Sequence, residues 1–389
     1  MKKSLLALAV LGAFAGAVQA QSSVTIYGIV DEGITYNSKV ATNNAGASGS
    51  QFQVNSGVIQ GSRLGFKGTE DLGGGLSAIF ALEAGFNADT GALSASGTGG
   101  TSTLFRRKSI VGLGGGFGTV TVGRQTDYAD TISAFTAVND FGGIVGNIHG
   151  QDRLEGTRTN NSVAYTTTNL SGFTGNLMYG FGETAGSTST GQAFGLAGQY
   201  VNGPLGLGLN YYQSKASSTP SDTGLLTSTG LLNTNYTAGQ TAEKVLNAVA
   251  SYQFGPARVY GNYSLVKMPQ NVAGNISGLT TAAVTSATLS LTNAKKTSTF
   301  EIGTAYSLTA ALKLLAAIDY SKATFDGVSN TGKLTQFSLG TDYSLSQRTD
   351  LYAFVADMRA KNMYNPGVFS ATGSDSSQAS VTVGVRHKF

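Results

Sequence analysis

Residues 58–71 read VIQGSRLGFKGTED, and the order of apolar and charged side chains in this stretch decides the fold. Leu64 and Phe66 alternate with Arg63 and Lys67, which is the period-2 pattern of a strand with one apolar and one polar face. Taken alone, the pattern leaves two choices open. The charged side chains face either bulk solvent on an open sheet or water that is enclosed inside a closed one.

The first twenty residues, MKKSLLALAVLGAFAGAVQA, have a different character from the rest of the chain. Lys2 and Lys3 precede the apolar run Leu5–Val18, and small residues end at Ala20. This arrangement predicts a secretory signal peptide over 1–20, cleaved to leave a mature chain of 21–389. A membrane anchor helix is the weaker alternative, because the apolar run is shorter than the roughly 20 residues that a span needs.

The composition excludes several classes of protein. The chain has 25 basic and 21 acidic side chains, and because two of the basic ones lie in the signal peptide, the mature charge is nearly balanced. That balance indicates no nucleic-acid partner. The absence of cysteine excludes a disulfide framework and a thiolate metal site, and no cofactor or metal is expected.

Charge and hydropathy together point to a membrane barrel. Charged residues are only 12% of the chain, against roughly 25% in soluble domains. Glycine is frequent, with 54 residues, and yet the mean hydropathy is +0.01. After Ala20 there is no apolar run of about 18 residues, so transmembrane helices are not expected. A strand barrel reconciles these facts, because half of its strand residues face lipid and half face water.

The mature chain divides into about sixteen alternating segments of about ten residues, and their connections alternate in length. Short ones include Leu72–Gly75 and Asn202–Pro204, whereas long ones include 38–55, 127–157 and 215–241. Short turns on one rim and long loops on the other are typical of outer-membrane barrels. The sequence therefore predicts an all-β, sixteen-stranded antiparallel transmembrane barrel with short periplasmic turns and long extracellular loops.

This prediction settles where Arg63 and Lys67 lie. A lysine or arginine on the lipid face costs about 2–4 kcal/mol at the midplane, so both should face inward. A barrel of about 16–18 strands leaves an aqueous channel, whereas one of about eight is filled by side chains. We therefore expect both residues to face enclosed water.

The long segment 127–157, DYADTISAFTAVNDFGGIVGNIHGQDRLEGT, is too apolar for a free surface loop. Its apolar residues need a surface to pack on, and folding into the barrel would provide one and narrow the pore. The alternative is a loop that covers the rim or packs against a neighbouring subunit. We expect the inward position.

Six motifs carry a resemblance to a known family. They are SVTIYG (23–28), SRLGFKGTE (62–70), FRRKSIVGL (105–113), FGTVTVGRQ (117–125), RTNNSVAY (158–165) and VTVGVRHKF (381–389). In this order the chain resembles the general porins of Gram-negative outer membranes, in their β-proteobacterial branch. The resemblance implies a homotrimer in the outer membrane, with the third long loop folded inward, that passes small hydrophilic solutes and ions passively.

The resemblance also implies a charged constriction. Its basic cluster matches Arg63, Arg107 and Arg158, and its loop acid matches Asp140, which stands where relatives carry glutamate. Asp130 is a candidate for a second loop acid. Opposed charges across a narrow pore order water, and an excess of arginine favours anions, so weak anion selectivity is expected. For each arginine the alternative role is a structural ion pair or a rim contact with lipid head groups.

The C-terminal residue, Phe389, ends a strand whose alternate residues are apolar. In the family that the chain resembles, such a terminal aromatic strand is the signal that the barrel assembly machinery recognises. The alternative, which is compatible with the first, is a residue of the aromatic girdle beside the membrane lipids.

Catalysis is not expected. The chain has two histidines, and neither His149 in the long loop nor His387, which faces lipid by parity, accompanies a nucleophile motif. A substrate-specific channel for sugars or aromatic acids is the main alternative function, and it would show an aromatic track along the lumen. A structural or adhesive barrel with a plugged lumen is a further alternative.

Overall fold

The computed structural model describes residues 23–42, 48–94, 103–136, 142, 153–215, 241–268, 294–326, 328–368 and 373–389. The predicted signal peptide lies outside this part of the chain. Seventeen strands are present in the described residues: β1 (Ser23–Ala41), β2 (Ser48–Ser56), β3 (Arg63–Gly73), β4 (Leu76–Gly85), β5 (Lys108–Gly115), β6 (Gly118–Thr126), β7 (Arg158–Thr166), β8 (Phe173–Gly180), β9 (Ala193–Asn202), β10 (Leu205–Lys215), β11 (Thr241–Phe254), β12 (Ala257–Lys267), β13 (Lys296–Ser307), β14 (Leu312–Phe325), β15 (Val328–Ser344), β16 (Thr349–Lys361) and β17 (Ser377–Lys388).

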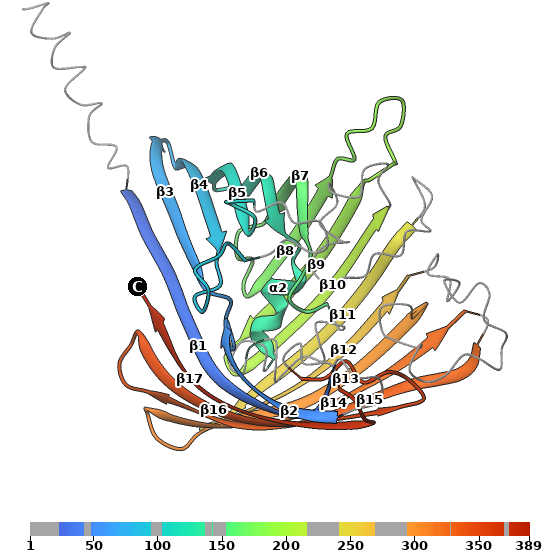
Figure 1. The fold of residues 1–389 in the computed structure, drawn as a ribbon. Helices are drawn as coiled ribbons and strands as arrows, with labels where there is room; N and C mark the ends of the chain where they lie inside the picture. Colours follow the sequence, from blue (N-terminus) through green and yellow to red (C-terminus); the bar gives the residue numbers. More distant parts are fainter. Residues whose placement is uncertain are drawn as a thin grey trace, which may run out of the picture.

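These strands form one closed antiparallel barrel (Figure 1). From β3 onward, each strand pairs with the next one along the chain, and β17 closes the barrel against β1. At the closure, Gly28 and Phe389 exchange two backbone hydrogen bonds of 3.0 and 3.1 Å. Closure leaves no unpaired edge in the hydrocarbon, where each unsatisfied backbone group would cost several kcal/mol.

The seventeen strands occupy sixteen positions, as the sequence predicts. Residues 23–29 of β1 pair with β3, whereas residues 32–41 pair with β2, so β2 and β3 are two pieces of one position. Between β2 and β3 the strand pairing is interrupted at 57–62, although we expected one strand over 58–71. There the Asp31 carboxylate accepts the backbone N–H groups of Ile59 and Gln60 at 2.8 and 2.7 Å, in place of strand pairing.

The segment expected as a loop at 38–55 is largely strand in the structure. The first strand continues to Ala41 and the second begins at Ser48. The sequence hides most of this pairing because Ser, Asn, Gly and Gln make up more than half of the segment, and apolar alternation is limited to Phe52 and Val54.

The two faces of the sheet alternate as the sequence predicts. On β13, Phe300 and Ile302 are 56% and 60% exposed on the outside, while Glu301 between them is buried on the inside. On β14, Ile318 and Tyr320 are exposed and Asp319 is buried. The lipid face is therefore apolar and the inner face is polar. In the described part of the chain no helix is long and apolar enough to cross a membrane.

The third long loop folds into the barrel, which confirms the expected inward position. It contains helix α2 (Ala129–Ile132) and the 3-10 turn η1 (Ser133–Phe135), and Figure 1 shows α2 within the ring of strands. Ile132 and Phe135 pack on Gly206 and Gly208 of β10. A β-carbon at Gly208 would lie 2.7 Å from that of Ile132, so these glycines form the recess that admits the loop.

Candidate functional site

A charged cluster lines the inner wall at the level of the third loop. Arg63 is the first residue of β3, and Arg107 lies immediately before β5. Both meet Glu83 of β4. The Arg107 Nε lies 2.5 Å from a Glu83 carboxylate oxygen, and an Arg63 guanidinium nitrogen lies 4.0 Å from the same oxygen. The structure therefore brings together two of the three predicted arginines around an acid that sequence reasoning did not single out.

Strand parity explains why these side chains meet. Arg63 and Gly85 are cross-strand partners, as are Gly65 and Glu83, and Glu83 also faces Lys108 of β5. These residues therefore share the inner face. Because Arg107 lies in the bend before β5, its side chain reaches Glu83 although simple alternation would turn it outward.

Tyr27 and Lys67 extend the cluster along the wall. The Tyr27 hydroxyl donates to Glu83 at 3.0 Å, and the Lys67 ammonium lies 5.3 Å from the centre of the Tyr27 ring. Such a cation–π contact contributes about 0.5–1 kcal/mol at an exposed site. Lys67 therefore lies on the inner face, as its parity predicts, and is exposed to the lumen.

The third loop brings an acid to these cations. Asp130 lies on α2 and interacts electrostatically with Arg158, Arg107, Lys108 and Arg63. Burial raises the pKa of the Asp130 carboxyl above its ordinary value, and the four cations oppose that rise.

Arg158, the first residue of β7, is the third predicted arginine. It lies in the fields of Arg107 and Arg106 and of the loop acids Asp130 and Glu155. The cluster thus spans β3 to β7. Its strand residues are Arg63, Lys67, Glu83, Lys108 and Arg158, Arg107 precedes β5, and the loop contributes Asp130 and Glu155. Asp140, the other predicted loop acid, lies outside the described residues.

A buried clamp fixes the base of the third loop. Arg153 lies 3.0 Å from a carboxylate oxygen of Glu243 on β11, and the two side chains are 5% and 1% exposed. Arg153 also donates to the Thr157 hydroxyl. Asp127 accepts the backbone N–H groups of Ala129 and Thr157 at 2.8 and 3.0 Å. These contacts join both ends of the loop to the wall.

The Asp127 carboxyl gives this clamp a pH dependence. Burial raises the pKa of Asp127 to about 7, from an ordinary value of 3.8. The folded state then binds more protons than the unfolded state between about pH 4 and 7, so this group's contribution to stability falls as pH rises through that window. Relative to the parent, Asp127→Asn should therefore gain melting temperature as pH rises from 4 to 8. Thermal unfolding in detergent measures this difference, and a difference independent of pH would contradict the assignment.

Of the residues that sequence reasoning missed, Glu83 carried a readable signal. It is the one charge in the otherwise apolar stretch LSAIFALEAGF at 76–86, and a charge there must face water. The Arg153–Glu243 pair carried no such signal, because it joins residues 90 apart in the sequence.

Among the residues that the structure describes, no three histidine, cysteine, aspartate or glutamate side chains converge as metal ligands.

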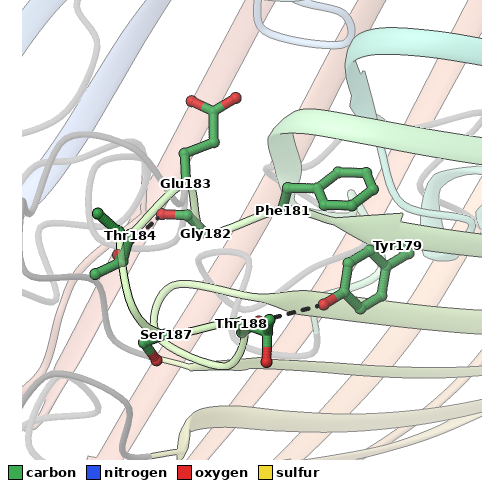
Figure 2. A pocket seen from close by; sticks show the side chains of 8 residues that line it. Tyr179, Phe181, Gly182, Glu183, Thr184, Ser187 and Thr188 are labelled. Atoms are coloured by element: carbon green, nitrogen blue, oxygen red, sulfur yellow. Dashed lines mark hydrogen bonds between the residues drawn. The ribbon is translucent and has the colours of Figure 1, made fainter.

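The loop between β8 and β9 forms a surface hollow beside Tyr179 and Phe181 (Figure 2). The Tyr179 hydroxyl donates to the Thr188 carbonyl at 3.4 Å. Tyr179 and Phe181 share the outward parity of β8, so the hollow lies outside the lumen.

Comparisons with known proteins agree with this architecture. A family model described as Gram-negative porin matches residues 7–363. Outer membrane porin protein 32 of Delftia acidovorans is 34% identical over 411 aligned positions that cover both chains completely. An outer membrane porin protein of Bordetella pertussis is 39% identical over 241 residues, which are 56% of this chain and 61% of that one.

A solved structure shows the same fold. The anion-selective porin from Comamonas acidovorans superposes with a TM-score of 0.71 at 27% identity, covering 95% of this chain and 100% of that one. The closed barrel, the inward loop and the family match lead to one conclusion: the chain belongs to the Gram-negative porin family of outer-membrane β-barrels.

Proposed function

We propose that this porin is a general diffusion channel, through which small hydrophilic solutes and ions cross the outer membrane passively with a weak preference for anions. The observation that carries the proposal is the charged cluster at the level of the third loop. In this cluster the wall contributes Arg63, Arg107 and Arg158, and the loop contributes Asp130, which lies opposite them.

The balance of charge at this level supports the anion preference. Arg63 and Arg107 share the single wall acid Glu83, so one positive charge remains there, and Lys108 adds another. Screening over about 8 Å at physiological salt confines the effect of these charges to the narrow part of the pore. A related solved structure, that from Comamonas acidovorans, is named anion-selective.

Liposome swelling tests the diffusion mechanism. Influx of neutral sugars should fall smoothly with solute size and should rise linearly with concentration, because a wide polar lumen has no saturable site. Sugar acids should enter faster than amino sugars of equal size. A substrate-specific channel would instead show saturation by one solute at low concentration.

Glu83 sets the strength of the preference. Removing its charge by Glu83→Gln leaves Arg63 and Arg107 uncompensated, so the ratio of anion to cation permeability should rise. A unit charge about 4 Å away contributes about 1 kcal/mol in water, about fivefold in local ion concentration, before screening. Zero-current potentials in a salt gradient measure the ratio. Asp357→Asn, beside exposed Arg359 at the rim, is the control and should leave it unchanged.

We infer that the assembled form is a homotrimer in contact with outer-membrane lipids. The apolar outer face supports this inference, with Ile26, Ile34, Phe52 and Val54 all more than half exposed on β1 and β2. Native electrophoresis in mild detergent, before and after heating, should show a threefold change in mass. A band of monomer mass before heating would contradict the trimer.

Assembly should depend on the last strand. Phe389 pairs with Gly28, and its ring covers that glycine so closely that a β-carbon there would collide with it. We expect Phe389→Ala to lower the amount of porin in the outer membrane, because the barrel assembly machinery would no longer recognise the terminal strand. Because the recognised residue is aromatic, Phe389→Leu should assemble as poorly as Phe389→Ala, whereas Phe389→Tyr should assemble normally. Parental amounts of Phe389→Ala in the outer membrane would contradict this role.

The predicted cleavage is checked by N-terminal sequencing of the mature protein, which should begin at Gln21.

A further inference from the structure

Six lysines lie on the outer face of the barrel at the rim of the long loops, on six neighbouring strands from β11 to β16 (Figure 1). They form two rows of direct cross-strand partners, which together we call the lysine belt. The first row is Lys244 of β11, Lys267 of β12 and Lys296 of β13. The second row is Lys322 of β14, Lys333 of β15 and Lys361 of β16.

Strand parity places the belt on the outside of the barrel. On β13, Lys296 shares the parity of the exposed Phe300, whereas the buried Glu301 has the opposite parity. On β14, Lys322 shares the parity of the exposed Tyr320. The lysines therefore extend away from the lumen and its charged cluster.

An aromatic row gives the level of the belt in the membrane. The outward residues Tyr263, Phe300 and Tyr320 are direct cross-strand partners, and the first two rings have their centres 4.7 Å apart. Aromatic girdles lie at the two interfaces of such barrels. Lys322 follows Tyr320 by two residues and Lys267 follows Tyr263 by four, so at about 3.3 Å per residue the belt lies roughly 7–13 Å beyond the aromatic row. This is the level of lipid headgroups.

The opposite rim of the same strands has a different character. There the exposed outward side chains include Tyr252, Tyr306 and Tyr343, at the short-turn ends of β11, β13 and β15. The belt therefore marks the membrane surface at the long loops.

The described part of the chain supplies no counter-charge to the belt. Among the described residues, none of the six lysines forms an ion pair. Two acids lie at the same rim, and both are engaged elsewhere: Asp326 pairs with Lys295 at 2.8 Å and Asp357 pairs with Arg359 at 2.7 Å.

The long segments beside the belt add almost no negative charge. Residues 216–240 and 269–293 together contain a single acid, Asp222. Like charges directly opposite each other on neighbouring strands are destabilising, and each row brings three of them together. The belt therefore calls for an anion from outside the chain.

We propose that the lysine belt binds the phosphate groups of lipid headgroups in the leaflet at the long-loop rim. Lysine packs its aliphatic stem along apolar surface while its ammonium reaches the headgroups, and it binds phosphate as a point charge. Cross-strand partners have β-carbons roughly 4.5–5.5 Å apart, so one phosphate can contact two neighbouring lysines of a row. An outward position above an aromatic row fits a lipid better than a solute of the lumen.

Binding of this kind would seal the boundary between barrel and leaflet. Neighbouring lipid phosphates repel one another, and the lysines would neutralise those that border β11 to β16. The inference rests on the proposed contact with outer-membrane lipids, but it does not depend on conduction.

Fluorescence anisotropy tests the belt, with purified porin in detergent and a labelled diphosphoryl lipid A as the probe. We expect the dephosphorylated form of the probe to bind at least about tenfold more weakly, and salt at about 1 M to weaken binding of the phosphorylated form by shortening the screening length. Each lysine near an anionic lipid surface contributes roughly fivefold in affinity. Replacing either row of three with glutamine should therefore weaken binding at least about tenfold, and the variant with all six replaced should bind both probes equally.

A control of equal charge uses the opposite rim. Lys313→Gln, Arg348→Gln and Lys388→Gln together remove three positive charges near the short turns and should leave the affinity for the phosphorylated probe unchanged. Equal affinity of the parent for the two probes, or parental affinity in the six-lysine variant, would overturn the proposal. Displacement of the probe by millimolar inorganic phosphate would overturn the lipid as the partner in favour of a free anion. Loss of the trimer in the six-lysine variant would assign the belt to the subunit interface instead.

The outcome is separable from that of the proposed function. The six-lysine variant should keep the parental conductance, because the belt lies outside the lumen. If the porin conducts no ions in bilayers but binds the phosphorylated probe through the belt, the lipid site stands and the diffusion function fails. If the porin conducts and the six-lysine variant binds the probe as the parent does, the reverse holds.

Discussion

Replacing Arg63, Arg107 and Arg158 together with glutamine should reverse the ion preference of the pore. The three changes remove three of the wall cations, so that only Lys67 and Lys108 of the named cluster still face the acids Glu83, Asp130 and Glu155. Each unit charge at about 4 Å contributes about 1 kcal/mol in water. Even with screening, the ratio of anion to cation permeability should fall at least about fivefold and pass below one. The zero-current potential across a tenfold salt gradient should therefore change sign.

A control of equal charge makes this result specific. Lys39→Gln, Lys295→Gln and Arg359→Gln also remove three positive charges, but each lies in an exposed ion pair toward the loop ends of the strands. Because screening acts over about 8 Å at physiological salt, this triple variant should keep the parental sign. An unchanged potential in the Arg63/Arg107/Arg158 variant would show that these arginines serve structure and not selectivity.

Breaking the buried clamp of the third loop should have the second large effect. Arg153→Met leaves the Glu243 carboxylate buried on β11 without its cation. Removing one partner of a buried ion pair costs about 3–5 kcal/mol, because it leaves a buried charge without compensation. We expect the loop to leave the wall, while the strand ladder persists. Single-channel conductance should rise, and limited proteolysis should cut within 127–157.

Two further variants separate the charge effect from packing. The double variant Arg153→Met with Glu243→Met removes both charges and should recover most of the parental conductance, since an apolar pair often replaces a buried ion pair at no net cost. Gly208→Leu should displace the loop by steric means alone, because its side chain would occupy the place of Ile132. Parental conductance and protease resistance in Arg153→Met would contradict the clamp.

Much of the fold can be predicted from the sequence because a barrel strand carries its signal locally. The alternation around Glu301 and the parity of Leu64 and Arg63 each follow from the physics of one strand between lipid and water. The interruption at 57–62 could not be predicted in this way. It depends on Asp31, a residue of another strand, whose carboxylate accepts the backbone N–H groups that leave the ladder.

The residues of the charged site also differ in whether the parity of one strand or the packing of the whole barrel places them. Arg63 and Lys67 are placed by parity, which the sequence shows. Arg107 was assigned to the cluster by the family resemblance alone, because it lies in a bend where parity no longer applies. Asp130 was only a candidate in the sequence, since its position depends on how α2 packs on the glycines of β10. The Arg153–Glu243 pair depends wholly on long-range closure of the barrel.

The most direct test of the central claim is made on the mature porin in a planar bilayer, with a tenfold gradient of salt across it. The account predicts conductance steps that come in groups of three and scale with salt concentration, and a zero-current potential on the anion side. A membrane that stays silent, or a potential on the cation side, would contradict an open pore governed by Arg63, Arg107 and Arg158.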